Sequence, residues 1–572
     1  MQKHFFQTHF SQQHRACALA VACALSLLLS ALAPQQSAAA ERQILAVAAC
    51  DSYGDLKKQI AWLGNQINNP GLAGMVESVL LLGTQGKGLA GLDVKRPLGV
   101  VLTTAGDDLS AHAFVPVKDV DKLLDSLQSI TGPVDRSDDS RRITLPSGER
   151  LVVVEKNGWA ILSLEGGDAG IADPAAIFAP LVADFSLGIE AFPSLLPKSL
   201  QKQLQTLLQQ GAAAAAANGQ SLDDDSLQAA VAGLSQTESL TLGLAIDSEK
   251  NRVFLENRVM AVAGSQAAAA IAAAGNGVLT VATPPAADGK QPALYLHAVQ
   301  PLTKESQTQA LQVFDQALDQ ALDQARDQAL ANARADALVQ TLALVCREIL
   351  AGMLASGGID AVLAVDTSET TEENPLPALF AGTRVKEGTA IEKQLKQLLA
   401  DKKNLPAGVS VAFDTDTVAT ARLHAVRLDL SASPVAEKLG DSLEITLAIA
   451  PEYVFVLAGG DPKKRLAELL KTNGRKNATA KPVATVQLAM DRLLDYAAQL
   501  GAGPQATLAA EAARVGTEGS LVQLLIRPIE RGLATRLSVD AGVLRAGAAM
   551  ATQPGGNRPV PLPPGFPLPL PR

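Results

Sequence analysis

The sequence predicts an α+β protein made of two tandem copies of a module that combines an antiparallel sheet with helices on one face. Three observations carry this prediction. Short β-prone runs are joined by turn-forming residues, as in hairpins. Amphipathic helices follow these hairpins, and the order of strands and helices in the first part of the chain recurs in the second. With 572 residues, the chain also exceeds what one hydrophobic core usually supports.

The clearest unit of this pattern lies between residues 98 and 130. Runs at 99–104 and 111–117 are joined by an Ala-Gly-Asp-Asp turn and predict a strand pair. Asp119 can cap the following helix, in which apolar residues recur three and four positions apart. The same order returns between residues 359 and 399, where Thr389 and Glu392 form a capping-box pattern at the start of a helix.

Other elements repeat around this unit. Each copy opens with an apolar strand and later has a strand that begins with an aromatic residue, Trp159 or Tyr453. An Asp-Pro pair then opens a helix in both copies, since Asp caps a helix and Pro fits its first turn. The predicted segments are a signal peptide (1–40), a first α+β repeat (41–274), an Ala/Gly/Pro-rich linker (275–291), a second α+β repeat (292–551) and a Pro-rich disordered tail (552–572).

The second copy differs from the first by a long Ala/Gln-rich helical arm. Residues 315–330 read DQALDQALDQARDQAL, and we expect one continuous helix from about residue 304 to 355. Because each four-residue step turns a helix by 400°, the Leu stripe of this arm winds around its surface. The arm is interpreted as a solvated spacer, and gripping of a partner is the alternative.

The N-terminal residues are typical of an exported protein. Lys3 and Arg15 precede or flank an apolar run at 16–32, and three alanines at 38–40 suit a signal peptidase. Removal of this leader leaves 47 basic and 58 acidic residues, so nucleic acid is a poor partner. We expect a periplasmic, cell-surface or secreted protein with no transmembrane segment in the mature chain. Its two cysteines, Cys50 and Cys346, are expected to be buried free thiols.

Several segments resemble a known family: RPLGVVLTT, AFVPVKDVDKLLDSL, NGWAILS, ADPAAIF and ESLTLGLAID. They are similar to large secreted α+β repeat proteins of planctomycete bacteria, a family with no assigned activity. The resemblance covers residues 46–267 best and reaches the second copy only through the internal repeat. It implies export and an α+β repeat, and it transfers no functional residue.

Recognisable catalytic motifs are absent from the sequence. His112, His297 and His424 each stand alone in a predicted strand, without the clustered spacing of a zinc site. Ser199 and Lys202 form the SxxK pattern of serine β-lactamases, but its partner motifs are missing, which favours a surface helix. We therefore predict no catalytic, cofactor-binding or metal-binding residues and no cofactor.

Two further patterns are weaker. Gly86, Gly88 and Gly91 match GxGxxG, but a helix precedes them and a strand follows, the reverse of a dinucleotide site. Asp414 and Asp416 could touch calcium, but no twelve-residue loop with a terminal Glu follows. These two carboxylates are expected to be solvated loop acids.

Composition and motifs together favour an exported, non-enzymatic binding or structural protein of the cell envelope. Its partner would be an envelope protein or a small apolar ligand. The alternative is a periplasmic or secreted hydrolase of unrecognised type that uses Ser199, Lys202 or an acidic pair brought together by folding. Convergence of such groups in a deep pocket would favour the hydrolase, whereas an apolar groove would favour ligand binding.

Overall fold

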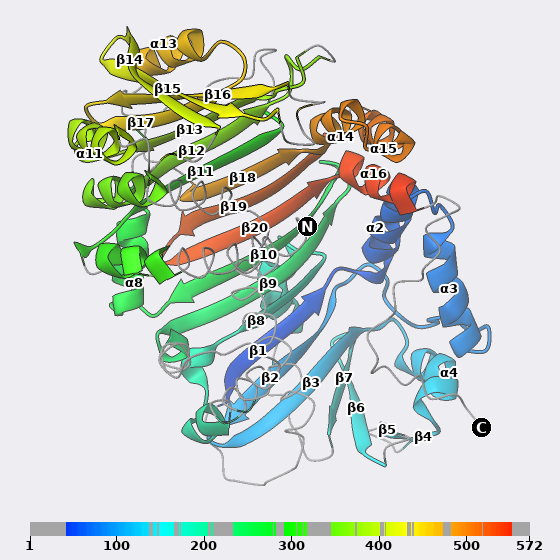
Figure 1. The fold of residues 1–572 in the computed structure, drawn as a ribbon. Coiled ribbons are helices and arrows are strands. Elements are labelled where there is room, and N and C mark those ends of the chain that lie inside the picture. Colours follow the sequence, from blue (N-terminus) through cyan, green and yellow to red (C-terminus); the bar gives the residue numbers. More distant parts are fainter. Residues whose placement is uncertain are drawn as a thin grey trace.

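A computed structural model of the chain shows an α+β protein dominated by one antiparallel sheet of 20 strands (Figure 1). The predicted signal peptide, the Pro-rich tail and most of the DQAL arm lie outside the described residues. These residues are 42–551 without 137–140, 146–147, 165–170, 172, 204–205, 207–209, 211–232, 278–279, 282–290, 305, 313, 317–344, 372–373, 401–404, 406–407, 432–435, 437–439, 473–481 and 517–518.

The first half of the sheet contains ten strands in the spatial order β4-β5-β6-β7-β3-β2-β1-β8-β9-β10. The strands are β1 (Gln43–Cys50), β2 (Leu98–Ala105), β3 (Asp108–Pro116), β4 (Val134–Arg136), β5 (Arg141–Thr144), β6 (Arg150–Lys156), β7 (Trp159–Leu164), β8 (Leu187–Ala191), β9 (Thr237–Asp247) and β10 (Arg252–Ala261). The helices are α2 (Tyr53–Gln66), α3 (Leu72–Gly83), α4 (Val120–Thr131), α5 (Pro174–Val182), the short η1 (Pro193–Leu195) and α8 (Gln266–Ala274).

The second half adds ten strands in the order β20-β19-β18-β11-β12-β13-β17-β16-β15-β14. They are β11 (Leu294–Pro301), β12 (Gly358–Asp366), β13 (Ala378–Arg384), β14 (Val409–Val418), β15 (Ala421–Asp429), β16 (Ser442–Ala450), β17 (Tyr453–Ala458), β18 (Ala484–Ala489), β19 (Leu521–Ile529) and β20 (Gly532–Asp540). The helices of this half include α11 (Gly388–Ala400), α13 (Pro462–Thr472), α14 (Met490–Gln499), α15 (Pro504–Arg514) and α16 (Ala541–Ala551).

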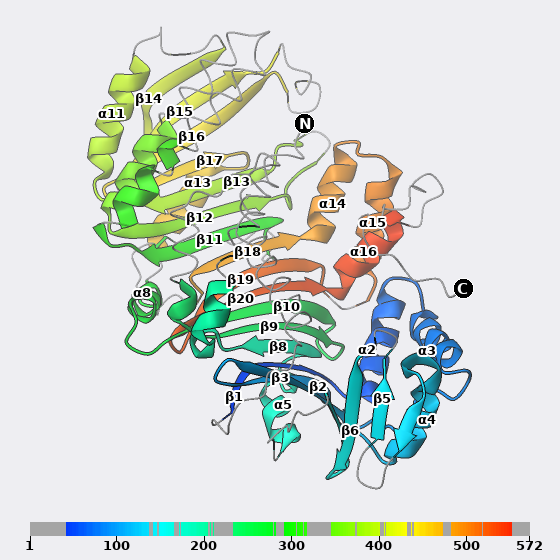
Figure 2. The same ribbon diagram turned by 90° about the horizontal axis from the view of Figure 1, so that it is seen from below.

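Strands β10 and β20 join the halves in the middle of the sheet, and Figure 2 shows the sheet continuing across this junction. Arg252 pairs with Asp540 at one end of the two strands, and Met260 pairs with Gly532 at the other. Glu256 and Arg536 lie opposite each other at the centre. The two halves therefore share one hydrogen-bonded sheet.

Helices cover both faces of the sheet, so the prediction that they lie on one face is wrong. Trp159 and Ala160 are neighbours in β7 and point to opposite faces. Trp159 packs with Phe178 of α5, whereas Ala160 packs with Leu124 of α4. The reason lies in the strand sequences, because WAILSL in β7 and YVFVLA in β17 are apolar on both sides and both sides need cover.

Local predictions near the helix ends are confirmed in the first half. Asp119 caps α4 by accepting a hydrogen bond from the backbone of Lys122, and Asp173 caps α5 in the same way from Ala175. In the second half, the predicted capping box is wrong. Helix α11 begins at Gly388, one residue before Thr389, and Glu392 contacts β15 instead of the helix start.

The prediction of one continuous helix from residue 304 to 355 is also wrong. Arg347 and Asp315 form an ion pair with Nε and Oδ1 2.8 Å apart. Thirty-two residues of straight helix would separate them by about 48 Å. The two described ends of this segment therefore lie against each other.

Candidate ligand-binding face

Aliphatic side chains line one face of the six central strands, β8, β9, β10, β20, β19 and β18. In β9, for example, leucines alternate with small residues, which places the two sets on opposite faces. We call the leucine side the aliphatic face, because directly paired residues of neighbouring strands point the same way. It comprises Leu187, Ile189, Ala191, Leu240, Leu242, Leu244, Ile246, Val253, Leu255, Asn257, Val259, Leu533, Thr535, Leu537, Val539, Val522, Leu524, Ile526, Pro528, Ala484, Val486 and Leu488.

The leucines at the centre of this face are exposed. Leu187, Leu244, Leu255 and Leu537 form one row across four adjacent strands. Their exposed fractions are 47%, 36%, 45% and 41%. Burying what is left exposed would gain roughly 1 kcal/mol for each side chain. Contiguous exposed apolar surface of this kind marks an interaction site rather than a core.

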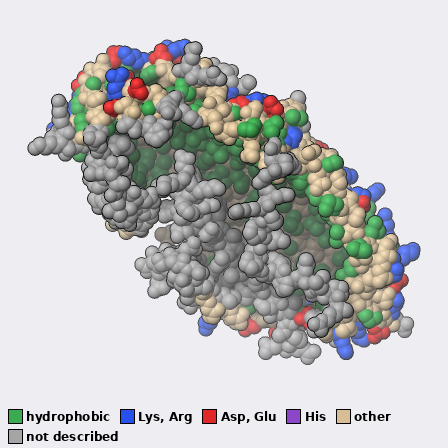
Figure 3. Space-filling model, turned by 45° about the vertical axis from the view of Figure 1, so that its right-hand side comes forward, with side chains coloured by type: hydrophobic (Ala, Val, Ile, Leu, Met, Phe, Trp, Pro, Cys, Tyr) green, Lys and Arg blue, Asp and Glu red, His purple; other side chains and the backbone are tan. Residues whose placement is uncertain are grey.

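The row continues through Leu524 and Val486, which are half-buried. Six strands at a spacing of about 4.8 Å give it a length of roughly 24 Å. Figure 3 shows that one side of the molecule is hollowed and that hydrophobic side chains line the visible part of the hollow. This length and shape suit an extended apolar ligand better than a compact one.

Helices stand on the aliphatic side at the two ends of the sheet. At one end, α11 packs on Val456. Direct strand pairing connects Val456 to Val486 through Ala381, Leu363 and Leu296, so Val456 lies on the aliphatic side of the sheet. At the other end, α4 packs in the same hydrophobic cluster as Leu162 of β7. Strand pairing from Leu162 to Ile189 of the aliphatic face places Leu162 on that side of the sheet. Figure 1 shows α4 and α11 far apart, with the central strands between them. Helices thus flank the aliphatic face at both ends of the sheet.

The opposite face of the same strands is polar and charged. Glu256, which is fully buried, accepts hydrogen bonds from Arg536 and from Arg258, whose Nε lies 2.6 Å from Oε1. Burial alone would raise the pKa of Glu256, but the hydrogen bonds from these two guanidinium groups outweigh it and hold the pKa below its usual range. The guanidinium of Arg258 also lies 4.9 Å from the centre of the Phe185 ring. The charged side chains of this face therefore bind one another and Phe185.

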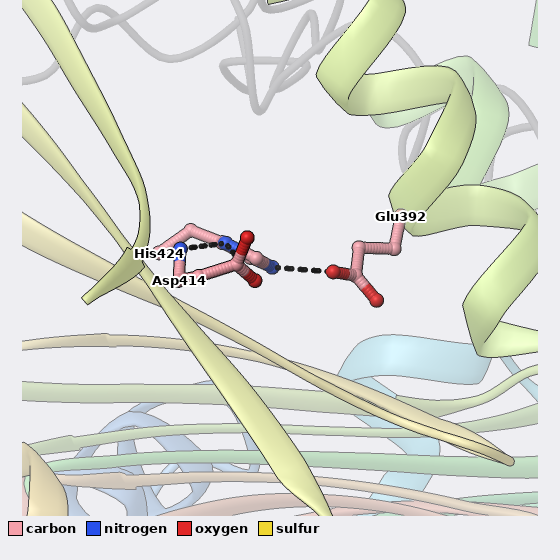
Figure 4. A group of neighbouring side chains, drawn as sticks. All are labelled: Glu392, Asp414 and His424. Carbon is pink, nitrogen blue, oxygen red and sulfur yellow. Dashed lines mark hydrogen bonds and ion pairs between the residues drawn. The ribbon is translucent and has the colours of Figure 1, made fainter. Parts of the chain in front are cut away.

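A second cluster lies on the outer strands of the second half, where Glu392, Asp414 and His424 meet (Figure 4). His424 and Glu392 are buried, with Nε2 and Oε1 3.6 Å apart. Sequence reasoning missed this cluster because its members come from α11, β14 and β15. Asp414 and Asp416 lie in β14 and not in a loop, and Asp414 adopts a φ of 55° where the register of β14 shifts.

The chemistry of this cluster does not fit a metal ion. The Nζ of Lys396 lies 2.8 Å from Glu392 and 2.6 Å from Asp414, so an ammonium already bridges the two carboxylates. The Nδ1 of His424 accepts a hydrogen bond from the backbone N–H of Asp414, which leaves the proton of the neutral ring on Nε2. The ring atom that faces Glu392 is therefore a donor, whereas a metal ligand must offer a lone pair.

The residues considered for catalysis do not converge in the described part of the chain. Ser199 is exposed, and its hydroxyl donates to Asp107 at 2.6 Å rather than to Lys202. His112 and His297 are buried in β3 and β11. Burial lowers the pKa of His297, although the charge of Asp360 acts against this shift. None of these groups forms a nucleophile–base pair with Ser199.

Among the described residues, Cys50 and Cys346 are free thiols, as predicted, but they are not both buried. Cys50 is half-buried at the end of β1, and Cys346 is exposed. Cys50 pairs with Leu187 in the sheet and so adjoins the aliphatic face. Burial of the Cys50 thiol raises its pKa, which favours the neutral form.

Comparison of the chain with protein-family models finds no match, and comparison with curated proteins finds no similar sequence. Among the described helices, none is long and apolar enough to cross a lipid bilayer.

Proposed function

We propose that this protein is an exported, non-enzymatic binding protein that holds an aliphatic hydrocarbon ligand on the aliphatic face. The observation that carries the proposal is the exposed row of Leu187, Leu244, Leu255 and Leu537 across four adjacent strands. Ligand sites are typically concave and mostly apolar, with few polar groups. An extended hydrocarbon chain fits such a row.

The composition of the aliphatic face favours hydrocarbon over a protein partner. None of its residues is aromatic or charged. Protein interfaces are enriched in Tyr, Trp, Phe and Arg and have a polar rim, because these groups anchor and orient the partner. A flexible acyl or alkyl chain needs no such anchors. Its affinity comes from the area that it removes from water.

Export is part of the proposal. It is supported by the basic residues, apolar run and small residues at the start of the chain, and by the resemblance to secreted proteins of planctomycete bacteria. An envelope location would place the protein where lipids with long aliphatic chains are abundant. Fractionation of cells that produce the full chain tests this part, since a mature polypeptide in the cytosol would contradict it.

We also propose that the two halves arose by duplication of one α+β unit. The pairing order from β1 to β10 is repeated from β11 to β20, and Trp159 and Tyr453 open equivalent strands, each paired with the last residue of β3 or β13. The register of β10 with β20 is symmetric about Glu256 and Arg536. Such symmetry would make the aliphatic face a composite of two equal parts.

The binding proposal is tested by titration of the purified mature chain with an uncharged fluorescent probe that carries a long alkyl chain. Leu255→Asn combined with Leu537→Asn should weaken binding at least tenfold, because two apolar contacts are replaced by amides that need hydrogen bonds. Leu82→Asn is the matched control, since Leu82 is 82% exposed on α3 and lies outside the face. It should bind as the unmodified chain does.

Two outcomes would overturn the proposal. One is the absence of saturable binding by the unmodified chain, and the other is equal binding by the double variant. Sedimentation tests whether a second copy of the chain, and not a lipid, covers the aliphatic face. If the unmodified chain forms dimers that the double variant cannot form, the aliphatic face is an interface between two copies and not a lipid site.

A further inference from the structure

Two polar residues interrupt the aliphatic face, and they lie side by side. Asn257 of β10 pairs directly with Thr535 of β20. Directly paired side chains have Cβ atoms about 5 Å apart. Asn257 follows Glu256 by one position, and Thr535 precedes Arg536 by one position. The side chains of Asn257 and Thr535 therefore point to the aliphatic side, whereas those of Glu256 and Arg536 point to the charged side. We call Asn257 and Thr535 the polar pair.

Within the described part of the chain, the polar pair has no hydrogen-bonding partner on the protein. Neither side chain donates to or accepts from another described residue, although Asn carries two donors and Thr carries one. Covering these groups with hydrocarbon alone would cost free energy, because their bonds to water would be lost without replacement. A ligand that covers the centre of the face must therefore offer a polar group there.

The surroundings define that group as uncharged. The arginines nearest in sequence, Arg258 and Arg536, lie on the opposite face and are engaged with Glu256. No charged residue belongs to the aliphatic face, so a carboxylate or phosphate above the polar pair would lose its hydration without gaining a counter-ion. A neutral acceptor such as an ester or hydroxyl oxygen matches the amide N–H and hydroxyl donors.

Hydrocarbon surface extends on both sides of the polar pair along the two strands. Leu255 and Leu537 flank it on one side, and Val259 and Leu533 flank it on the other. We infer that the polar pair binds a neutral acceptor group near the middle of the ligand. The ligand class is then a long-chain ester with two hydrocarbon arms, and this inference rests on the proposed binding function.

The test compares four ligands with sixteen carbons: hexadecane, hexadecan-1-ol, octyl octanoate and palmitate. The unmodified mature chain should bind octyl octanoate about tenfold more tightly than hexadecane, the effect of one or two net hydrogen bonds. Palmitate at pH 8 should bind no better than hexadecane. Asn257→Leu combined with Thr535→Val should abolish the preference for the ester while keeping the binding of hexadecane.

Retained binding of hexadecane by this variant also shows that it is folded. The inference is overturned if the double variant still prefers the ester, or if the unmodified chain binds palmitate most tightly. Thr535→Ser, which keeps the hydroxyl, should retain the preference and serves as the conservative control. Failure of the unmodified chain to bind any of the four ligands would instead refute the proposed function on which the inference rests.

Discussion

Phe254 and Leu255 are neighbours in β10, yet they lie in opposite environments. Phe254 is buried and contacts Phe185 at a ring distance of 6.4 Å, with the guanidinium of Arg536 4.1 Å from its ring. Leu255 points to the other side and is 45% exposed. Charged and small polar side chains therefore lie on the same side of the central sheet as Phe254. The aliphatic side chains lie on the opposite side, with Leu255. The difference indicates that the buried side supports the fold, and it agrees with the proposal that the aliphatic face is kept open for a ligand.

The largest expected effect is on stability, and it tests this comparison directly. Phe254→Ala should lower the free energy of unfolding by about 3–5 kcal/mol, because it leaves a cavity under Arg536 and beside Phe185. Leu255→Ala should cost only about 1 kcal/mol, because the side chain is already half in water. Urea denaturation of both variants measures the difference. Equal losses would show that Leu255 belongs to a core.

The next largest effect on stability is expected from Glu256 and the arginines that contact it, on the same side of the sheet as Phe254. Glu256→Ala should destabilise the protein by roughly 2–3 kcal/mol, since three arginines lose their shared acceptor. This is less than for a fully buried ion pair, because these arginines remain partly exposed and solvent screens them. Glu256→Gln keeps the shape and separates the loss of charge from the loss of packing. Ligand binding by both variants should be unchanged if the two faces act independently.

Much of the fold was predictable because its signals are local. The strand runs and the Asp caps at Asp119 and Asp173 depend on residues within a few positions of each other. The capping box at Thr389 failed because Arg422, more than thirty residues away, contacts the Glu392 that the box requires. A local pattern cannot reveal such competition.

The aliphatic face was not predicted, although its signal is present in the sequence. In β9, Leu240, Leu242 and Leu244 alternate with small residues, a pattern that normally places the leucines in a core. The small residues are required on the buried side, because a side chain at Gly243 would collide with the ring of Phe185. Only the packing of α5 and Phe185 on that side shows that the leucines face outward. The polar pair is likewise defined by the pairing of strands almost 280 residues apart.

Acidification should produce a smaller effect. Burial holds the pKa values of His297 and His424 below their usual range in the folded protein. The unfolded chain binds protons below about pH 6.5, whereas the folded chain resists them, so stability should fall as the pH drops below that value. Each histidine contributes at most about 1.4 kcal/mol per pH unit to this slope. Urea denaturation at pH 7 and pH 5 should show a shallower dependence for His424→Asn, and an unchanged dependence would contradict the assignment.

The smallest expected effect is that of metal ions. Addition of Zn²⁺ or Ca²⁺ should leave the thermal midpoint unchanged within about 1 °C, because Lys396 already bridges Glu392 and Asp414. Lys396→Met removes the ammonium and serves as the contrasting variant. A rise in the midpoint of the unmodified chain that Glu392→Gln abolishes would show that the cluster binds metal after all.

The central claim is tested most directly by native mass spectrometry of the protein, produced in cells from the full sequence and purified without detergent. The account predicts an additional mass that organic extraction identifies as a neutral lipid with long aliphatic chains. This mass should be absent from the Leu255→Asn, Leu537→Asn variant and present in Leu82→Asn. A ligand-free spectrum for the unmodified chain, together with no uptake of added long-chain ester, would contradict the account.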